Sequence, residues 1–244
     1  MFDTKGLLDQ FLGTGGAGGV ASKGKSYVQN NAGGLAGGAI AGGLAGLLLG
    51  TKSGRKLGKN ALTYGGMALV GGLAYKAYRD YQAGSGGSNP ESPSPHNPNA
   101  GSASDPLHIE PPAGSPFSVD QAPGGAESFA LSLMQAMINA AKADGHIDAD
   151  EQQRIFAKID EADLDAQQKA FLMDELRAPL DIEKIVAGAR TPEGAAEIYA
   201  ASRLAIDPDH PAEQAYLQML AARMGLEQGL VNEIEAAVRE AEAA

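Results

Sequence analysis

Hydrophobic residues follow two different patterns along this chain. From Ala126 onward they recur about every 3.6 positions, which is the spacing of one face of an α-helix. The first such face consists of Phe129, Leu133, Met134, Met137, Ile138 and Ala141. No run in this part of the chain alternates as a β-strand does. The pattern therefore predicts an all-α domain over residues 126–244 with about seven helices.

Residues that typically begin helices separate these apolar runs. Asp148 precedes Glu151 by three positions, the spacing of a capping box. Asp181 opens another segment, and Thr191–Pro192 places a capping side chain before a proline suited to the first helical position. Pro211 begins a further amphipathic run in the same way. These signals predict helix N-termini at each position.

The second pattern is a glycine-rich apolar run. Ala32–Gly50 contains 19 residues without a charge, about enough for a helix to cross the hydrocarbon core of a bilayer. Glycine recurs every fourth position in it, at Gly34, Gly38, Gly42, Gly46 and Gly50. Such a stripe lets two helix backbones approach closely in lipid. The run predicts a membrane helix with a packing face along the stripe.

A shorter apolar run, Asn60–Tyr75, follows the basic segment Thr51–Lys59. Tyr75, Tyr78 and Tyr81 at its end are typical of the membrane–water interface. The sequence thus predicts a membrane anchor over residues 32–83, formed by one helix or by a helical hairpin.

Residues 1–31 form an amphipathic and Gly-rich N-terminal arm. In Met1–Leu12 the apolar side chains fall on one helical face, which predicts a short helix lying on the bilayer or against the protein. Gly19–Ser26 matches the letters of a P-loop, but the glycines before it do not form the strand that this phosphate site requires. We therefore expect no nucleotide site there.

The segment of residues 84–125 is rich in Pro, Ser and Gly and predicts a disordered linker. The alternative is that a short apolar peptide within it, around Leu107–Ile109 or Phe117–Val119, docks on another part of the protein. Formal charge differs among the three regions: +6 over residues 1–83, −4 over 84–125 and −13 over 126–244. The acidic domain would repel nucleic-acid phosphates, so we expect no nucleic-acid partner. The basic N-terminal region suits anionic lipid headgroups.

Two turns of the acidic domain carry clustered oxygen ligands. The candidate metal ligands are Asp144, Asp148, Glu151, Asp207 and Glu213. Carboxylates of this kind bind hard divalent cations such as Ca²⁺ and Mg²⁺, and the alternative is that they only cap helix N-termini. The chain has no Cys, which excludes thiol nucleophiles and Cys-based metal sites. No nucleophile lies in a recognisable catalytic turn, so we predict no catalytic residues and no enzymatic activity.

The sequence Ala140–Glu151, AAKADGHIDADE, resembles the signature of the TerB-like tellurite-resistance family. The Gly-rich anchor and Pro-rich spacer resemble the YebE-like inner-membrane branch of that family. The resemblance implies an all-α bundle and a stress-linked role at the membrane, with no defined activity. The family often carries a second acidic turn, but the matching stretch Ala205–Glu213 lacks its Asp-Gly pair, which argues against a symmetric two-turn metal site.

These patterns together predict a membrane-anchored interaction or sensor module. The expected location is the bacterial inner membrane, with the C-terminal domain in the cytoplasm. The expected partners are membrane lipids and either another protein or a second copy bound through the glycine stripe. The alternative is a divalent-cation-binding protein or metal-dependent enzyme that uses the acidic turns.

Overall fold

The computed structural model describes Thr4, Leu7, Leu8 and residues 66–85, 111–118, 121–145, 166–206 and 208–243. Regular structure in these ranges is entirely helical, as the hydrophobic pattern predicts. The helices within the described ranges are α6 (Gly66–Ser85), α7 (Ala126–Ala141), α9 (Ala166–Arg177), α10 (Ile182–Gly188), α11 (Pro192–Ala205), α12 (Pro211–Met224) and α13 (Gln228–Ala243).

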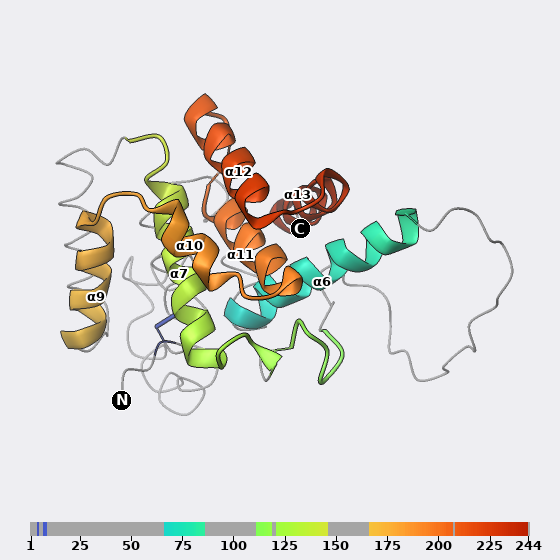
Figure 1. Cartoon of the computed structure of the whole chain (residues 1–244), viewed down its shortest axis with the longest axis horizontal. Coiled ribbons are helices and arrows are strands. Elements are labelled where there is room, and N and C mark those ends of the chain that lie inside the picture. The colour runs from blue at the N-terminus through green and yellow to red at the C-terminus, as the bar shows by residue number, and fades with distance from the viewer. Residues whose placement is uncertain are drawn as a thin grey trace, which may run out of the picture.

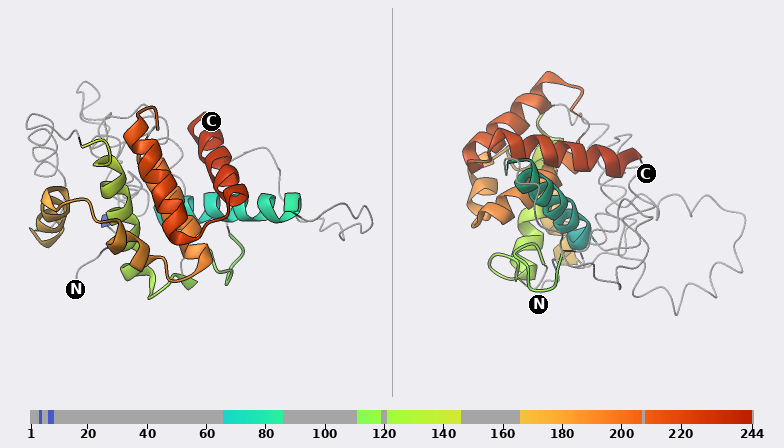
Figure 2. Two further views of the ribbon diagram at one scale, coloured as in Figure 1. Left: turned by 45° about the horizontal axis from the view of Figure 1, so that its top comes forward. Right: turned by 90° about the vertical axis from the view of Figure 1, so that its right-hand side faces the viewer.

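Helix α11 lies at the centre of the bundle (Figures 1 and 2). Every residue from Gly194 to Ala205 is buried. It packs most extensively against α7, and also against α6, α13 and α12. Five of its buried residues are alanines, which let neighbouring helices approach closely. Since α11 touches most of the other helices, it organises the core.

The amphipathic predictions for individual helices are confirmed. All residues of the predicted α7 face are buried except Ala141, which is half-buried. Two of the predicted caps form: Asp181 Oδ1 accepts a hydrogen bond from the Lys184 amide at 3.1 Å, and Thr191 Oγ1 accepts one from the Gly194 amide at 3.0 Å. The predicted capping box of Asp148 and Glu151 lies outside the described residues. Helix α12 ends at Gly225, whose φ of 67° places it in the left-handed region that glycine adopts readily.

Helix α6 differs from its sequence assignment. It was predicted as part of a membrane anchor, yet it packs against α11 and α13, with Leu69, Val70, Leu73 and Ala77 buried in the protein core. No helix in the described ranges is long and apolar enough to cross a membrane. Apolar side chains are buried as readily between protein helices as in lipid. Glycines in such a helix let the backbone of a neighbouring helix come close in either setting. Residues 66–85 therefore belong to the helical bundle.

Part of the predicted linker is ordered as well. Residues 111–118 and 121–125 follow a defined path, and Phe117 is only 5% exposed. Its ring lies against two α6 tyrosines, with centroid distances of 5.9 Å to Tyr75 and 5.5 Å to Tyr78. Tyr75 and Tyr78, which were expected at a lipid interface, thus pack against Phe117 of this segment. Phe117 belongs to one of the two short peptides that the sequence offered as a docking alternative to a disordered linker.

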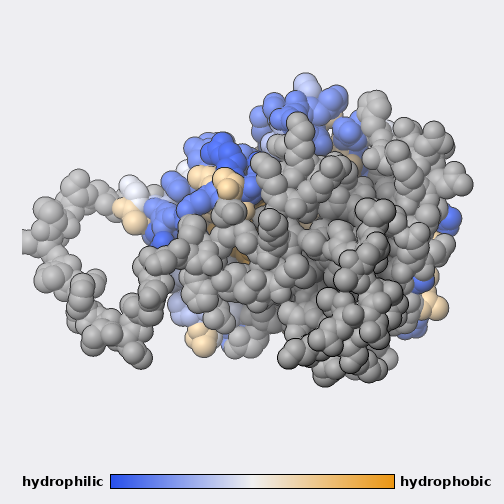
Figure 3. Space-filling view, turned by 180° about the vertical axis from the view of Figure 1, so that it is seen from behind, coloured by the Kyte–Doolittle hydropathy of each residue, from blue (hydrophilic) through white to orange (hydrophobic). Residues whose placement is uncertain are grey.

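Three residues near the N-terminus, Thr4, Leu7 and Leu8, are described, and they lie against the bundle. Leu7 and Leu8 are completely buried and belong to the same hydrophobic core as Phe129 of α7. In Figures 1 and 2 the short blue segment lies beside α7. The outer surface of the described part is mainly hydrophilic in the view from behind (Figure 3), and its exposed large hydrophobic residues are Leu180 and Met219.

Candidate functional site

The acidic turns predicted as a metal site are only partly described. Asp144 lies in the turn after α7, and Glu213 lies in the first turn of α12. Asp148, Glu151 and Asp207 lie outside the described residues, as do Gly34, Gly38, Gly42, Gly46 and Gly50 of the predicted packing stripe.

Glu213 takes part in a capping box at the start of α12. Its carboxylate accepts a hydrogen bond from the His210 amide at 3.4 Å, while His210 Nδ1 accepts one from the Ala212 amide at 3.3 Å. This reciprocal arrangement satisfies backbone donors that the first turn leaves without partners. For Glu213, the structure supports the capping role that the sequence offered as the alternative to metal binding.

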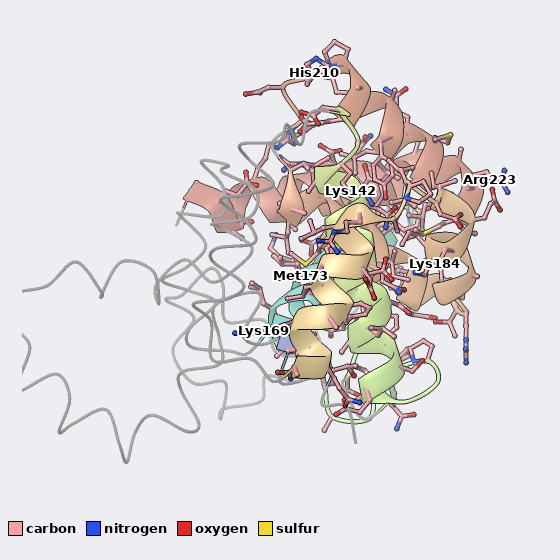
Figure 4. All side chains as sticks on the ribbon, turned by 90° about the vertical axis from the view of Figure 1, so that its left-hand side faces the viewer. Lys142, Lys169, Met173, Lys184, His210 and Arg223 are labelled. Carbon is pink, nitrogen blue, oxygen red and sulfur yellow. The ribbon has the colours of Figure 1, made fainter. Side chains whose placement is uncertain are left out.

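The helix ends that flank the two acidic turns nevertheless lie at the same end of the bundle. The end of α7 and the start of α12 lie together there in both views (Figures 1 and 2), and the turn after Lys142 passes near His210 (Figure 4). Among the described residues, no group of three or more His, Asp or Glu side chains is placed to hold a metal ion. The cation site stays a prediction that depends on Asp148, Glu151 and Asp207.

A polar cluster around Glu175 of α9 was not anticipated from sequence. The Glu175 side chain is only 10% exposed, and its carboxylate accepts hydrogen bonds from Gln135 Nε2 at 2.8 Å and Lys184 Nζ at 2.5 Å. Lys142 Nζ donates to the backbone carbonyls of Glu175, at 2.9 Å, and Ala178. A lysine at this position satisfies carbonyls at the C-terminal end of α9 and complements the helix dipole.

The same face of α7 also holds the start of α10. Asn139 Oδ1 accepts a hydrogen bond from the Asp181 amide at 3.0 Å, and Asn139 Nδ2 donates to the Gln135 carbonyl at 2.8 Å.

Burial lowers the pKa of Lys142, an effect that the nearby Glu175 carboxylate partly offsets. We call Gln135, Asn139, Lys142, Glu175 and Lys184 the α7 clamp, and Lys142 and Lys184 are labelled in Figure 4. The clamp fixes the α9–α10 connection, from which Leu180 projects.

A second polar network joins α11 to α13. The Arg203 side chain is only 4% exposed, and its Nη1 donates to the Ile206 carbonyl at 2.8 Å and to Glu242 Oε1 at 3.1 Å. Arg203 Nε lies 3.8 Å from Glu235 Oε2, and Glu235 Oε1 accepts a hydrogen bond from the Tyr199 hydroxyl at 3.0 Å. Burial, followed by the charge of Glu235, raises the pKa of Tyr199, so this hydroxyl stays a donor. The network fastens the C-terminal helix to the central one.

Glu197 of α11 is the most perturbed carboxyl group in the described part of the chain. The residue is 5% exposed, and burial, together with the charge of Glu193, raises its pKa to about 8. A Cβ atom placed on Gly71 would lie 3.9 Å from Glu197 Oε2 and 3.8 Å from Pro111 Cγ. The carboxyl therefore lies where α6, α11 and the segment 111–118 meet. Chemically, it is a group that exchanges a proton near neutral pH.

The chain matches a known protein family. A family model described as "Protein of unknown function (DUF533)" matches residues 34–238. The chain belongs to this family. The DUF533 match begins within the glycine-rich run and ends in α13, so it includes most of that run, α6 and the helices after it up to residue 238.

A relative of this DUF533 chain is an "Uncharacterized protein in ampR 5'region" from Yersinia enterocolitica. It is 32% identical over 108 residues, which are 44% of this chain and 78% of the relative. No solved structure matches the chain.

Sequence reasoning missed the polar residues of α11 for a definable reason. No role was assigned to Glu197 or Arg203 from sequence, because charged residues of a helix usually lie on its solvated face. The sequence did contain a signal for their burial. Most positions of Pro192–Ala205 are Ala or another apolar residue, which leaves too few polar positions for a helix with a wide exposed face.

Proposed function

We propose that this DUF533 protein is a membrane-tethered helical module that binds another protein and has no catalytic activity. The observation that carries the proposal is the position of α6 in the core of the bundle. Only residues 51–65 separate this helix from the glycine-rich run Ala32–Gly50. A membrane contact made by that run would therefore hold the bundle close to the bilayer, without the long tether that the sequence suggested.

Charge supports an orientation toward anionic lipid. The segment between the run and α6 contains Lys52, Arg55, Lys56 and Lys59, and no acidic residue. Basic residues beside an apolar run favour the cytoplasmic face of the bacterial inner membrane. Residues 126–244 carry a formal charge of −13, which suits a basic protein partner and repels nucleic acid.

The fold that we propose is TerB-like. The all-helical architecture and the signature-like sequence Ala140–Glu151 support this assignment. In this reading the bundle is an interaction or sensor module with a stress-linked role. A second copy of the chain, bound through the stripe from Gly34 to Gly50, is a further partner.

Membrane fractionation with carbonate extraction tests the tether. The informative variant lacks residues 32–50, because a larger deletion through residue 83 would remove α6 and unfold the bundle. We expect the intact chain in the membrane pellet and this variant in the supernatant, both with helical circular dichroism. A matched control lacks residues 87–105, also 19 residues, from the Pro/Ser/Gly-rich segment and should stay in the pellet.

Two results would contradict the proposal. One is an intact chain that is extracted by carbonate, and the other is a variant lacking residues 32–50 that still pellets.

Self-association through the glycine stripe is tested separately. Gly42→Leu should reduce cross-linked dimers in membranes, because it fills the stripe, and unchanged cross-linking would remove the stripe from the proposal.

A further inference from the structure

The large hydrophobic side chains that are exposed in the described part of the chain lie beside one ion pair. Arg223 Nη2 of α12 lies 2.5 Å from Glu183 Oε1 of α10, and both side chains are more than half exposed. Met219, 47% exposed, precedes Arg223 by one helical turn, and Leu180, 38% exposed, comes three residues before Glu183. Arg223 and Lys184 of α10 lie at the same edge of the bundle in Figure 4. We call the surface formed by Leu180, Glu183, Met219 and Arg223 the α10–α12 face.

Leu180 is held outward by fixed backbone on both sides. The Lys142 ammonium group donates to the Ala178 carbonyl, two residues before Leu180. The Asp181 amide, directly after Leu180, donates to Asn139 Oδ1 at 3.0 Å. An apolar group that is already fixed loses little conformational entropy when a partner covers it, so more of the free energy of burial contributes to binding.

The α10–α12 face is electrically neutral in an acidic domain. Helices α10 and α12 each contain one acidic and one basic residue, whereas α13 contains four acidic residues and one basic residue. Residues 126–244 together have a formal charge of −13. Two copies of this domain therefore repel each other through their net charge. The neutral face lets them meet without bringing unpaired carboxylates together.

We infer that two copies of the chain associate through the α10–α12 face, about a two-fold axis that passes beside the Arg223–Glu183 pair. Such an axis places each arginine opposite the glutamate of the second copy, so that four charges alternate in sign around it. A face with one positive and one negative group is thus its own electrostatic complement. Met219 and Leu180 supply the apolar surface around this centre. The contact goes beyond the proposed membrane tether and does not depend on it.

Reversal of the ion pair tests the inference. The double variant Glu183→Arg with Arg223→Glu keeps the pair within each chain, and both positions are exposed, so the fold is retained. Two copies of the double variant still oppose unlike charges, as two unaltered copies do. A mixed pair instead opposes arginine to arginine and glutamate to glutamate, which disfavours association.

Capture from solution in a mild detergent measures this specificity. Every chain is full-length and also carries Gly42→Leu, which fills the glycine stripe and removes association through it. An affinity-tagged double variant should capture the untagged double variant, and at least about tenfold less of the untagged chain with the original ion pair. The tagged chain with the original pair should show the opposite preference.

Met219→Glu gives an independent measurement in the same full-length background. It should weaken dimerisation at least about tenfold in sedimentation experiments, because it places a carboxylate in an apolar contact. Ala236→Glu adds the same charge at an exposed position of α13 and is the matched control. It should dimerise as its parent chain does, and circular dichroism of both variants checks that they fold.

Three results would overturn the inference. The first is a parent chain that stays monomeric at the highest concentration studied. The second is a tagged double variant that captures the chain with the original pair as well as it captures itself. The third is a Met219→Glu variant that dimerises as strongly as Ala236→Glu. The membrane tether is decided separately by carbonate extraction, so either proposal fails without the other.

Discussion

The carbonyl oxygen of Phe117 lies so close to Gly71 that a Cβ atom on Gly71 would be 2.7 Å from it. Side-chain Cβ atoms essentially never come this close to a backbone oxygen. Gly71 is thus the point at which the segment 111–118 rests on α6, next to the aromatic contacts that Phe117 makes with Tyr75 and Tyr78. The absence of a side chain at one helical position allows a distant segment to complete the core.

Substitution of Gly71 should therefore be costly despite a gain in helix propensity. Gly71→Ala should lower the free energy of unfolding by about 1–3 kcal/mol, because the backbone of the 111–118 segment must move. Gly84→Ala in the same helix is the matched control, since nothing lies within 4 Å of its Cβ position. The control should be neutral or stabilising by up to about 1 kcal/mol. Denaturant unfolding of both full-length variants measures the difference, and equal effects would contradict it.

The α11–α13 network predicts that replacing Arg203 costs much more unfolding free energy than replacing Arg223. Arg203→Met should cost about 3 kcal/mol of unfolding free energy, since it leaves Glu242 and Glu235 without their partner. Arg223→Met should cost less than about 1 kcal/mol, because the Arg223–Glu183 pair is solvent-exposed. Thermal melts of the two variants test this. Similar melting temperatures would mean that α13 is not fastened through Arg203.

The α7 clamp gives a local prediction. Lys142→Met should destabilise the α9–α10 connection by about 1–2 kcal/mol, because the Glu175 and Ala178 carbonyls lose a charged donor. Hydrogen exchange should rise in α9 and α10 but not in α13. Exchange that rises uniformly would indicate a global effect, and exchange that does not change would show that the clamp contributes no stability.

Much of the bundle was predictable because its order is local. Helices α7 and α13 carry regular apolar stripes, and Asp181 and Thr191 cap helices that begin within a few residues of them. Helix α6 was not predictable in the same way. Its apolar and glycine-containing sequence suits both lipid and a protein core, and the helices that cover it lie more than 100 positions later in the chain.

The polar sites depend on pairings between distant residues. Arg203 meets Glu242 across 39 positions, Gln135 meets Glu175 across 40, and Thr4 meets Glu127 across 123. No spacing rule in the sequence connects such pairs. Conversely, the acidic turns stood out in the sequence because their carboxylates are adjacent, yet Glu213 is occupied with capping α12.

Glu197 gives the last prediction, a stability that depends on pH. Its pKa is about 8 in the folded protein, compared with an ordinary value of 4.5. Between these two pH values the folded chain retains a proton that the unfolded chain has released, so the free energy of unfolding falls as pH rises. The contribution is fully present below about pH 4.5 and is lost by about pH 8, with a slope of at most about 1.4 kcal/mol per pH unit.

Comparison of the wild-type chain with Glu197→Gln isolates this contribution, because all other groups titrate in both proteins. Urea unfolding between pH 5 and pH 9 should show the wild-type chain losing stability relative to the variant across the range, so that Glu197→Gln is the more stable protein at the alkaline end. Glu193→Gln is a useful second variant. It removes the neighbouring negative charge that raises the pKa of Glu197, and it should shift the end of the transition to lower pH without abolishing it. Parallel curves for the wild-type chain and Glu197→Gln would mean that the carboxyl group is hydrated in the folded protein, and that α6 and the 111–118 segment do not close over it.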